Sequence, residues 1–237
     1  MRTRRSTTLL AVVAAFALAA CGSNDDGPNP ASHPAGLLTS GDFDSTDYNY
    51  ESSNLLFALK AAGFPLDTTS SEDSTSIAAL LAGKDIIFMP ETSPAFDAGT
   101  QAILKAFVDG GGTIVLVGGY DHIDWVNTAF GWSLTTGLDW SNRHPMPKSG
   151  DASGTPFAGG PASLPANNGG QQLTAASLPT GGKVIYEGPD SDTDASVAIL
   201  PSGSGRLVYF GWDWYDGAPM GIQNGGWRTI LSETAGF

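Results

Sequence analysis

The side chains best suited to chemistry follow directly after apolar stretches of this sequence. Residues 85–89 (DIIFM) and 113–117 (TIVLV) lack polar alternation, as expected of strands buried on both faces of a parallel sheet. The carboxyl ends of parallel strands meet at one edge of the sheet, and ligands of such folds bind there. We therefore expect a candidate binding cleft at this edge, formed by Asp42, Asp44, Glu91, Tyr120, Asp121, His122, Trp212 and Asp213.

The carboxylates of this set suggest two kinds of chemistry. With or without a metal, Asp42, Asp44, Glu91, Asp121 and Asp213 suit a hydrolase, for example one directed at glycans. The loop that holds Asp42, Asp44 and Asp47 also has the oxygen ligands that Ca²⁺ or Mg²⁺ takes. It lacks the glycine and the later glutamate of an EF-hand loop. A solvated acidic loop is the simpler explanation, and the sequence predicts neither a metal site nor another cofactor.

His122 next to Asp121 suggests a base with its orienting carboxylate. Adjacent residues on a helix do not face each other, however, and no nucleophile accompanies this pair. Capping of the helix that follows explains Asp121 without catalysis. The sequence therefore predicts no catalytic residue here.

Aromatic side chains dominate residues 211–217 (GWDWYDG). In an extended segment Trp212 and Trp214 share one face, while Asp213 and Tyr215 share the other. One pair is then expected in the core and the other at the rim of the cleft, where aromatics and the amides of Asn142, Asn167 and Asn168 suit a sugar. Aromatics that merely cover the edge of the sheet are the simpler alternative, because large side chains dominate cores.

Strands and helices alternate along the chain, which predicts a mostly parallel, flavodoxin-like α/β sheet with helices on both faces. Expected strands are residues 37–40, 66–69, 85–89, 113–117 and 183–187, with a C-terminal hairpin of 196–200 and 206–210. Expected helices are residues 51–62, 76–81, one opened by Asp97 or Thr100, 121–130 and 226–235. Residues 132–182, rich in Gly, Pro, Ser, Thr and Asn, form a long irregular insertion.

The segment GGYDH (118–122), followed by a helix that ends in AFG (129–131), resembles the elbow of the class I glutamine amidotransferase-like superfamily. That family has G-x-C-x-G there, which puts Tyr120 at the place of the catalytic cysteine and His122 at that of the second glycine. The family's His-Pro-Glu triplet after a late strand corresponds to Gly211–Trp214, which has no histidine. The resemblance implies the fold over residues 36–237. Because a thiolate and its imidazole are both missing, it also implies that amidotransferase activity is absent.

The N-terminus has the pattern of a bacterial lipoprotein signal. Three arginines precede an apolar stretch, and Leu18-Ala19-Ala20-Cys21 matches a lipobox in which Cys21 is lipidated and becomes the mature N-terminus. Residues 1–20 are the expected signal peptide and residues 21–35 a flexible tether. We expect an exported protein of the cell envelope, held on the outer membrane if the cell has two membranes.

Composition limits the partners further. The three arginines leave with the signal, so 8 basic and 24 acidic residues remain in a mature chain of 217 residues, a net charge of −16. Such an acidic surface disfavours nucleic acid and anionic lipid headgroups. Cys21 is the only cysteine, so no intramolecular disulfide holds the domain together.

Together these features favour a lipid-anchored, non-catalytic domain that binds a carbohydrate or protein ligand at the carboxyl edge of its sheet. A hydrolase that uses the acidic set and a purely structural envelope protein are the alternatives.

Overall fold

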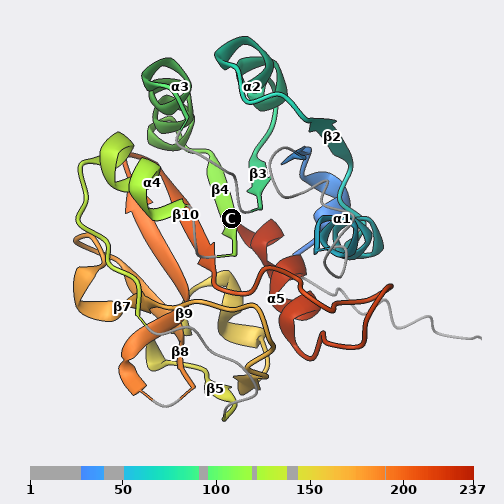
Figure 1. The fold of residues 1–237 in the computed structure, drawn as a ribbon, viewed down its shortest axis with the longest axis vertical. Helices are drawn as coiled ribbons and strands as arrows, with labels where there is room; N and C mark the ends of the chain where they lie inside the picture. The colour runs from blue at the N-terminus through green and yellow to red at the C-terminus, as the bar shows by residue number, and fades with distance from the viewer. Residues whose placement is uncertain (1–27, 40–50, 91–95, 119–121, 138–143, 190) are drawn as a thin grey trace, which may run out of the picture.

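An eight-stranded, mostly parallel sheet with helices on both faces forms the centre of the computed structural model (Figure 1). The structure describes residues 28–39, 51–90, 96–118, 122–137, 144–189 and 191–237. The strand order is β2-β1-β3-β4-β10-β9-β7, and β8 pairs with β9 outside this row. The strands are β1 (Ala35–Leu38), β2 (Leu66–Thr69), β3 (Ile86–Met89), β4 (Thr113–Val117), β7 (Leu173–Thr174), β8 (Lys183–Gly188), β9 (Ser191–Ser202) and β10 (Gly205–Phe210). From β2 to β10 neighbouring strands are parallel, while β9 joins β10 as an antiparallel hairpin.

The helices divide between the two faces because successive side chains of a buried strand point to opposite sides. In β4, Val115 and Val117 face one core, and Ile114 and Leu116 face the other. The first core includes α1 (Glu51–Ala62) and α5 (Trp227–Glu233), and the second includes α2 (Ser74–Leu81), α3 (Ala98–Asp109) and α4 (His122–Phe130). Figure 1 shows α2, α3 and α4 above the sheet and α5 below it.

The predicted fold class is confirmed, with small shifts of element ends. Strand β1 begins at Ala35, two residues before the expected start. Helix α2 begins at Ser74 because Asp73 accepts hydrogen bonds from the N–H groups of Thr75 and Ser76. Of the two proposed starts for α3, Asp97 is the N-cap: its carboxylate accepts a hydrogen bond from the Thr100 N–H at 2.7 Å.

The apolar spacing of residues 121–130 predicts a buried stripe of Ile123, Val126, Ala129 and Phe130, and the observed buried face of α4 differs from it. Trp125, which the predicted stripe omitted, is 1% exposed and packs edge-on against Phe96 at 5.2 Å between ring centroids. Ala129 and Phe130, which were expected in the stripe, are only partly buried. Gly131 ends the helix as predicted, in the left-handed conformation with φ 69°.

The described part of the 132–182 insertion is packed, although little of it is regular. It holds β5 (Met146–Pro147), β6 (Ser163–Leu164), β7 and three short 3₁₀ turns: η3 (Gly150–Ala152), η4 (Pro156–Gly159) and η5 (Ala175–Ser177). Phe157 and Leu164 are fully buried in the core that holds α1 and α5. The insertion thus extends the core on that face.

Residues 28–34, expected as part of a flexible tether, pack on the domain. They include the 3₁₀ turn η1 (Pro30–Ser32), and Asn29 caps it through its side chain. His33, expected in solvent, has a side chain only 28% exposed beside Asp85. Domain packing therefore begins at Pro28 rather than near Gly36, because this segment contacts the residues that precede β3.

Candidate functional site

Four neighbouring strands end together at the carboxyl edge of the sheet. The parallel registers pair Leu37 of β1 with Phe88 of β3, Met89 of β3 with Leu116 of β4, and Val117 of β4 with Phe210 of β10. Four positions of the candidate cleft lie two to four residues beyond three of these ends: Glu91, Tyr120, Asp121 and Asp213. The topology thus places the strand ends that precede these positions next to one another.

The turn after β4 begins as predicted. Gly118 has φ 83°, a conformation that costs glycine little and other residues more, and its N–H donates to the Phe210 carbonyl at 2.9 Å. Helix α4 starts at His122, four residues after Gly118. The His122 side chain, the predicted cleft residues Asp42, Asp44, Glu91, Tyr120 and Asp121, and the predicted lipidation site Cys21 lie outside the described residues.

Asp213 is the described carboxylate of the predicted cleft. It is partly exposed, and its Oδ1 accepts a hydrogen bond from the Tyr215 N–H at 2.8 Å. The loop at Gly169 runs directly against this carboxylate: a Cβ at Gly169, where φ is 77°, would lie 2.5 Å from both Asp213 oxygens. A side chain at position 169 would therefore strain the backbone and crowd the Asp213 carboxylate and the Tyr215 Cβ.

Trp212, expected at the cleft, is instead a core residue. Its side chain is fully buried and stacks on Trp214, with ring centroids 4.7 Å apart, while Trp227 of α5 packs 5.6 Å from it. Its indole N–H donates to the Asn168 carbonyl at 3.1 Å. The prediction that one aromatic pair packs into the core is confirmed, and the pair is Trp212 and Trp214. The Trp212 side chain is therefore not part of the candidate cleft.

Trp214 adopts a backbone conformation that few residues other than glycine take, with φ 69°. Its side chain is fully buried, and its indole N–H has no hydrogen-bond partner among the described residues. Asn54 of α1 fixes this conformation: its side-chain amide donates to the Trp214 carbonyl at 3.2 Å, and its Oδ1 accepts from the Met220 N–H at 3.3 Å.

Asn54 is a positioning residue that the sequence analysis missed. It is fully buried, and it ties α1 to residues 213–225, the loop that follows β10. A signal was present in the sequence, since Asn54 precedes Leu55 and lies one turn before Ala58 on the buried face of α1. A buried amide at such a place needs hydrogen-bond partners.

Helix starts add negative charge to the same edge. Hydrogen bonds from Ser71 and Ser76 hold the pKa of Asp73, the N-cap of α2, well below its usual range. The Thr100 N–H and hydroxyl lower the pKa of Asp97, the N-cap of α3, in the same way. Both carboxylates are therefore ionised at neutral pH, where they complement the helix dipoles.

One described cavity lies away from this edge, between the last turns of α1 and α5. It has a volume of about 350 Å³ and is lined by Pro28, Ala58, Ala61, Ala62, Arg228, Thr229, Ser232 and Glu233. Burial raises the pKa of Glu233 from 4.5 to about 7, opposed by the Lys148 ammonium. Within the described ranges, no group of three His, Cys, Asp or Glu residues is placed to hold a metal ion, and no helix is long and apolar enough to cross a membrane.

The strand order β2-β1-β3-β4-β10, with helices on both faces, defines a flavodoxin-like α/β domain. No protein-family model matches the sequence, and no curated protein matches it either. Solved structures do match the fold.

A putative ThuA-like protein from Bacteroides uniformis superposes with a TM-score of 0.58 at 14% identity, over 87% of this chain and 90% of its own. A second putative ThuA-like protein, from Parabacteroides merdae, gives a TM-score of 0.54 at 12% identity, over 86% of this chain and 88% of its own. The N-terminal domain of mmIFT52 also gives 0.54, at 15% identity, over 83% of this chain and 94% of its own. ThuA-like proteins have the class I glutamine amidotransferase-like fold, and this chain shares that fold.

Proposed function

We propose that this protein is a lipid-anchored component of the bacterial cell envelope whose glutamine amidotransferase-like domain has no amidotransferase activity. On this proposal the domain binds a carbohydrate or protein ligand at the carboxyl edge of its sheet. The observation that carries the proposal is the common end of β1, β3, β4 and β10. The segments that follow these strands hold carboxylates and Tyr120 where the family has a catalytic cysteine.

The absence of amidotransferase activity follows from the residue types at the elbow and after β10. The only cysteine of the chain is Cys21, far from the elbow in sequence, and Gly211–Trp214 replaces the histidine triplet. Without a thiolate and its activating imidazole, amide hydrolysis by this mechanism has no nucleophile. No contact of the described residues favours the hydrolase alternative, because Asp213 is the one described carboxylate of that set and its Oδ1 accepts a backbone hydrogen bond.

The anchor is tested by fractionation of cells that express the full chain. Cys21→Ser is expected to release a folded protein from membranes that retain the unchanged protein after washes with salt and carbonate. A Cys21→Ser protein that stays in the membrane fraction would rule out the lipid anchor. Ser23→Ala, which leaves the lipobox intact, is the matched control.

The binding edge is tested by nuclear magnetic resonance of the soluble domain with N-acetylglucosamine oligosaccharides as the probe. Shifts are expected at amides of the carboxyl edge such as Gly118 and Tyr215, and not at Ser204 on the opposite edge. Glu91→Gln and Tyr120→Phe are expected to weaken these shifts, whereas Asp85→Asn leaves them unchanged. If no amide responds to any oligosaccharide, the carbohydrate form of the proposal is rejected.

A further inference from the structure

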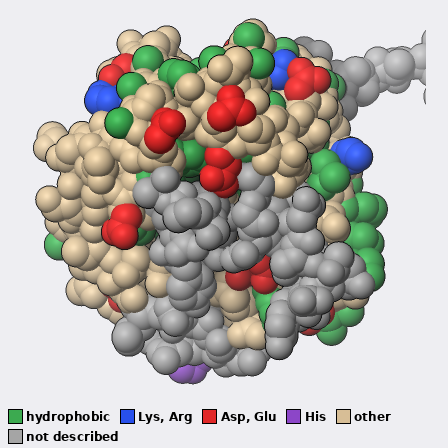
Figure 2. All heavy atoms as spheres, turned by 45° about the horizontal axis from the view of Figure 1, so that its top comes forward, with side chains coloured by type: hydrophobic (Ala, Val, Ile, Leu, Met, Phe, Trp, Pro, Cys, Tyr) green, Lys and Arg blue, Asp and Glu red, His purple; other side chains and the backbone are tan. Residues whose placement is uncertain are grey.

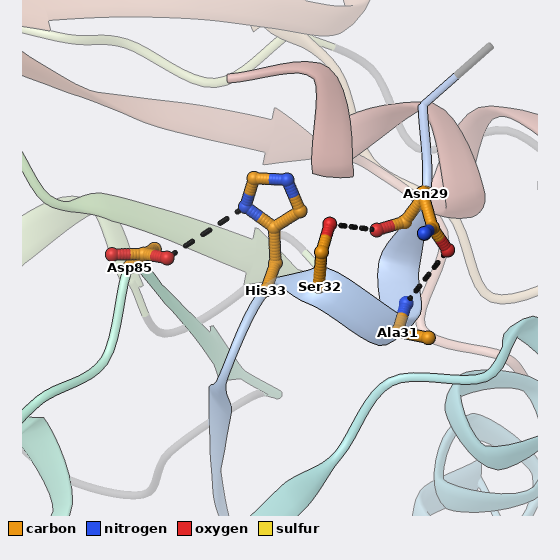
Figure 3. Close-up of polar contacts among 5 residues, drawn as sticks. All are labelled: Asn29, Ala31, Ser32, His33 and Asp85. Atoms are coloured by element: carbon orange, nitrogen blue, oxygen red, sulfur yellow. Dashed lines mark hydrogen bonds and ion pairs between the residues drawn. The ribbon is translucent and has the colours of Figure 1, made fainter. Parts of the chain in front are cut away.

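The chain leaves the folded domain at the amino edge of the sheet, opposite the candidate cleft. Ser32 Oγ donates to the Asn29 carbonyl at 2.8 Å, and the Ala31 N–H donates to Asn29 Oδ1 at 3.3 Å (Figure 3). His33 Nδ1 lies 3.7 Å from a carboxylate oxygen of Asp85, the residue before β3. The Asp85 N–H donates to the Pro34 carbonyl at 3.1 Å. These contacts hold the exit point beside the start of β3.

The length of chain between this exit and the proposed anchor is short. Six residues lie between Cys21 and Pro28, so the seven Cα–Cα steps from one to the other span at most about 25 Å when fully extended. A domain of the size of residues 28–237 has a radius of gyration of about 17 Å and is therefore roughly 40 Å across. Because this span is shorter than the domain, the carboxyl edge cannot squarely face a membrane that holds Cys21.

Charges are sorted between the same two edges. The helices of a parallel α/β fold begin at the carboxyl edge, where acidic residues complement the helix dipole, and end at the amino edge, where basic residues do. Described acidic residues near the carboxyl edge are Glu51, Glu72, Asp73, Asp97, Asp124, Asp213 and Asp216. Described basic residues near the amino edge are Lys60, Lys84, Lys105, Lys183 and Arg206.

Acidic residues offset part of the positive charge at the amino edge. Lys84 pairs with Asp67 there at 2.6 Å, Lys105 pairs with Asp109, and Asp85 lies beside His33. Lys60, Lys183 and Arg206 have no ion pair within the described part of the chain, and the Arg206 guanidinium lies over the Phe237 ring, 4.6 Å from its centroid. In Figure 2, Asp and Glu side chains lie around the central grey atoms, and Lys and Arg side chains appear only at the margin of the view.

We infer that the amino edge of the sheet, carrying Lys60, Lys183 and Arg206, faces the anionic phospholipid headgroups of the membrane that holds Cys21. The acidic carboxyl edge then points away from the membrane. The net charge of the domain repels such a surface as a whole, and this repulsion is strongest at the carboxyl edge, so it turns that edge outward. The inference rests on the lipid anchor of the proposed function and adds the direction in which the cleft is presented.

The test uses the full lipidated protein in vesicles of equal parts phosphatidylglycerol and phosphatidylcholine that contain a rhodamine-labelled lipid. Cys21 carries the lipid, so a single new cysteine is the one free thiol and takes a fluorescent donor. Ser204→Cys, in the exposed turn between β9 and β10, marks the amino edge. Ile222→Cys marks the opposite edge, where residue 222 is 91% exposed.

Energy transfer to the labelled lipid is expected to be several-fold stronger from position 204 than from position 222. Lys60→Glu combined with Lys183→Glu is expected to reduce this difference, whereas Thr75→Glu, at an exposed position in the first turn of α2, does not reduce it. Equal or reversed transfer from a protein that floats with the vesicles would overturn the orientation and leave the anchor in place. A protein that does not float with the vesicles would overturn the anchor and, with it, the orientation.

Discussion

The side-chain amide of Asn54 donates a hydrogen bond to the backbone carbonyl of Trp214, 160 residues later in the chain, at 3.2 Å. This bond joins the first turn of α1 to the loop that follows β10, and both lie at the carboxyl edge of the sheet. It is buried, so water cannot replace either partner. The loop that carries Asp213 therefore depends on a residue of α1 for its shape.

Replacement of Asn54 by Leu is expected to lower the free energy of unfolding by about 1–3 kcal/mol. The cost arises because the change leaves the Trp214 carbonyl and the Met220 N–H without their partner. Ser53→Ala, at an exposed neighbouring position on the same helix, is expected to cost less than about 0.5 kcal/mol. Urea titration of both variants measures the difference, and equal values would show that the Asn54 bonds contribute nothing.

Gly169→Ala is expected to destabilise the domain more than Gly154→Ala. Both glycines have positive φ, 77° and 71°, so each alanine carries a similar backbone cost of about 1–2 kcal/mol. Only the Cβ at position 169 meets the Asp213 carboxylate, since nothing lies within 4 Å of one at position 154. This crowding adds about 1–3 kcal/mol.

Thermal or urea unfolding compares the two alanine variants. When Asp213→Ala is added to each variant, it is expected to recover part of the stability lost in Gly169→Ala and none of the stability lost in Gly154→Ala. An equal loss of stability in Gly169→Ala and Gly154→Ala would contradict the close approach of the Gly169 loop to Asp213.

Glu233 is expected to make the domain less stable as the pH rises from about 4.5 to about 7. Burial raises the pKa of this carboxyl to about 7 in the folded state, so the folded protein holds a proton that the unfolded chain releases near 4.5. Its stabilising contribution is fully present below about pH 4.5 and is lost above about pH 7. Because Glu233 is only half buried, solvent limits the change to about 1–2 kcal/mol.

The measurement is the difference in free energy of unfolding between the unchanged protein and Glu233→Gln at about pH 5 and about pH 8. Glutamine carries no charge at either pH, so the variant should gain stability relative to the unchanged protein at the higher pH. The neighbouring groups are Lys148, whose charge opposes the shift, and Tyr186, whose own pKa is raised by burial and by Glu233. A difference that does not vary with pH would show that Glu233 is ionised throughout.

Tyr120→Ala is expected to change stability by less than about 0.5 kcal/mol if Tyr120 lies at the surface of the cleft. Phe210→Ala is the comparison, because Phe210 is fully buried in β10 and its loss should cost about 3–5 kcal/mol. Phe107 of α3 is a poorer comparison because it is only partly buried. A loss for Tyr120→Ala as large as that for Phe210→Ala would show that Tyr120 fills the old active site, leaving the proposed cleft without its centre.

The sequence by itself determined the elements and their order. Periods of 3.6 and 2 residues, glycines after helices and apolar strands are local properties, so they located α1, β2 and β4 at their observed ends. The same local signals gave the parallel arrangement and the edge at which β1, β3, β4 and β10 end.

Only the tertiary structure decided which side chains of that edge are buried. The alternation of side chains along an extended segment grouped Trp212 with Trp214 and Asp213 with Tyr215, but it did not say which of the two pairs enters the core. The positive φ of Trp214 also departs from a plain extended strand. The stacking of these rings, the Asn54 bonds and the packing of residues 28–33 beside Asp85 all join segments distant in sequence. Such contacts are selected by the free energy of the whole packed core, which no local pattern encodes.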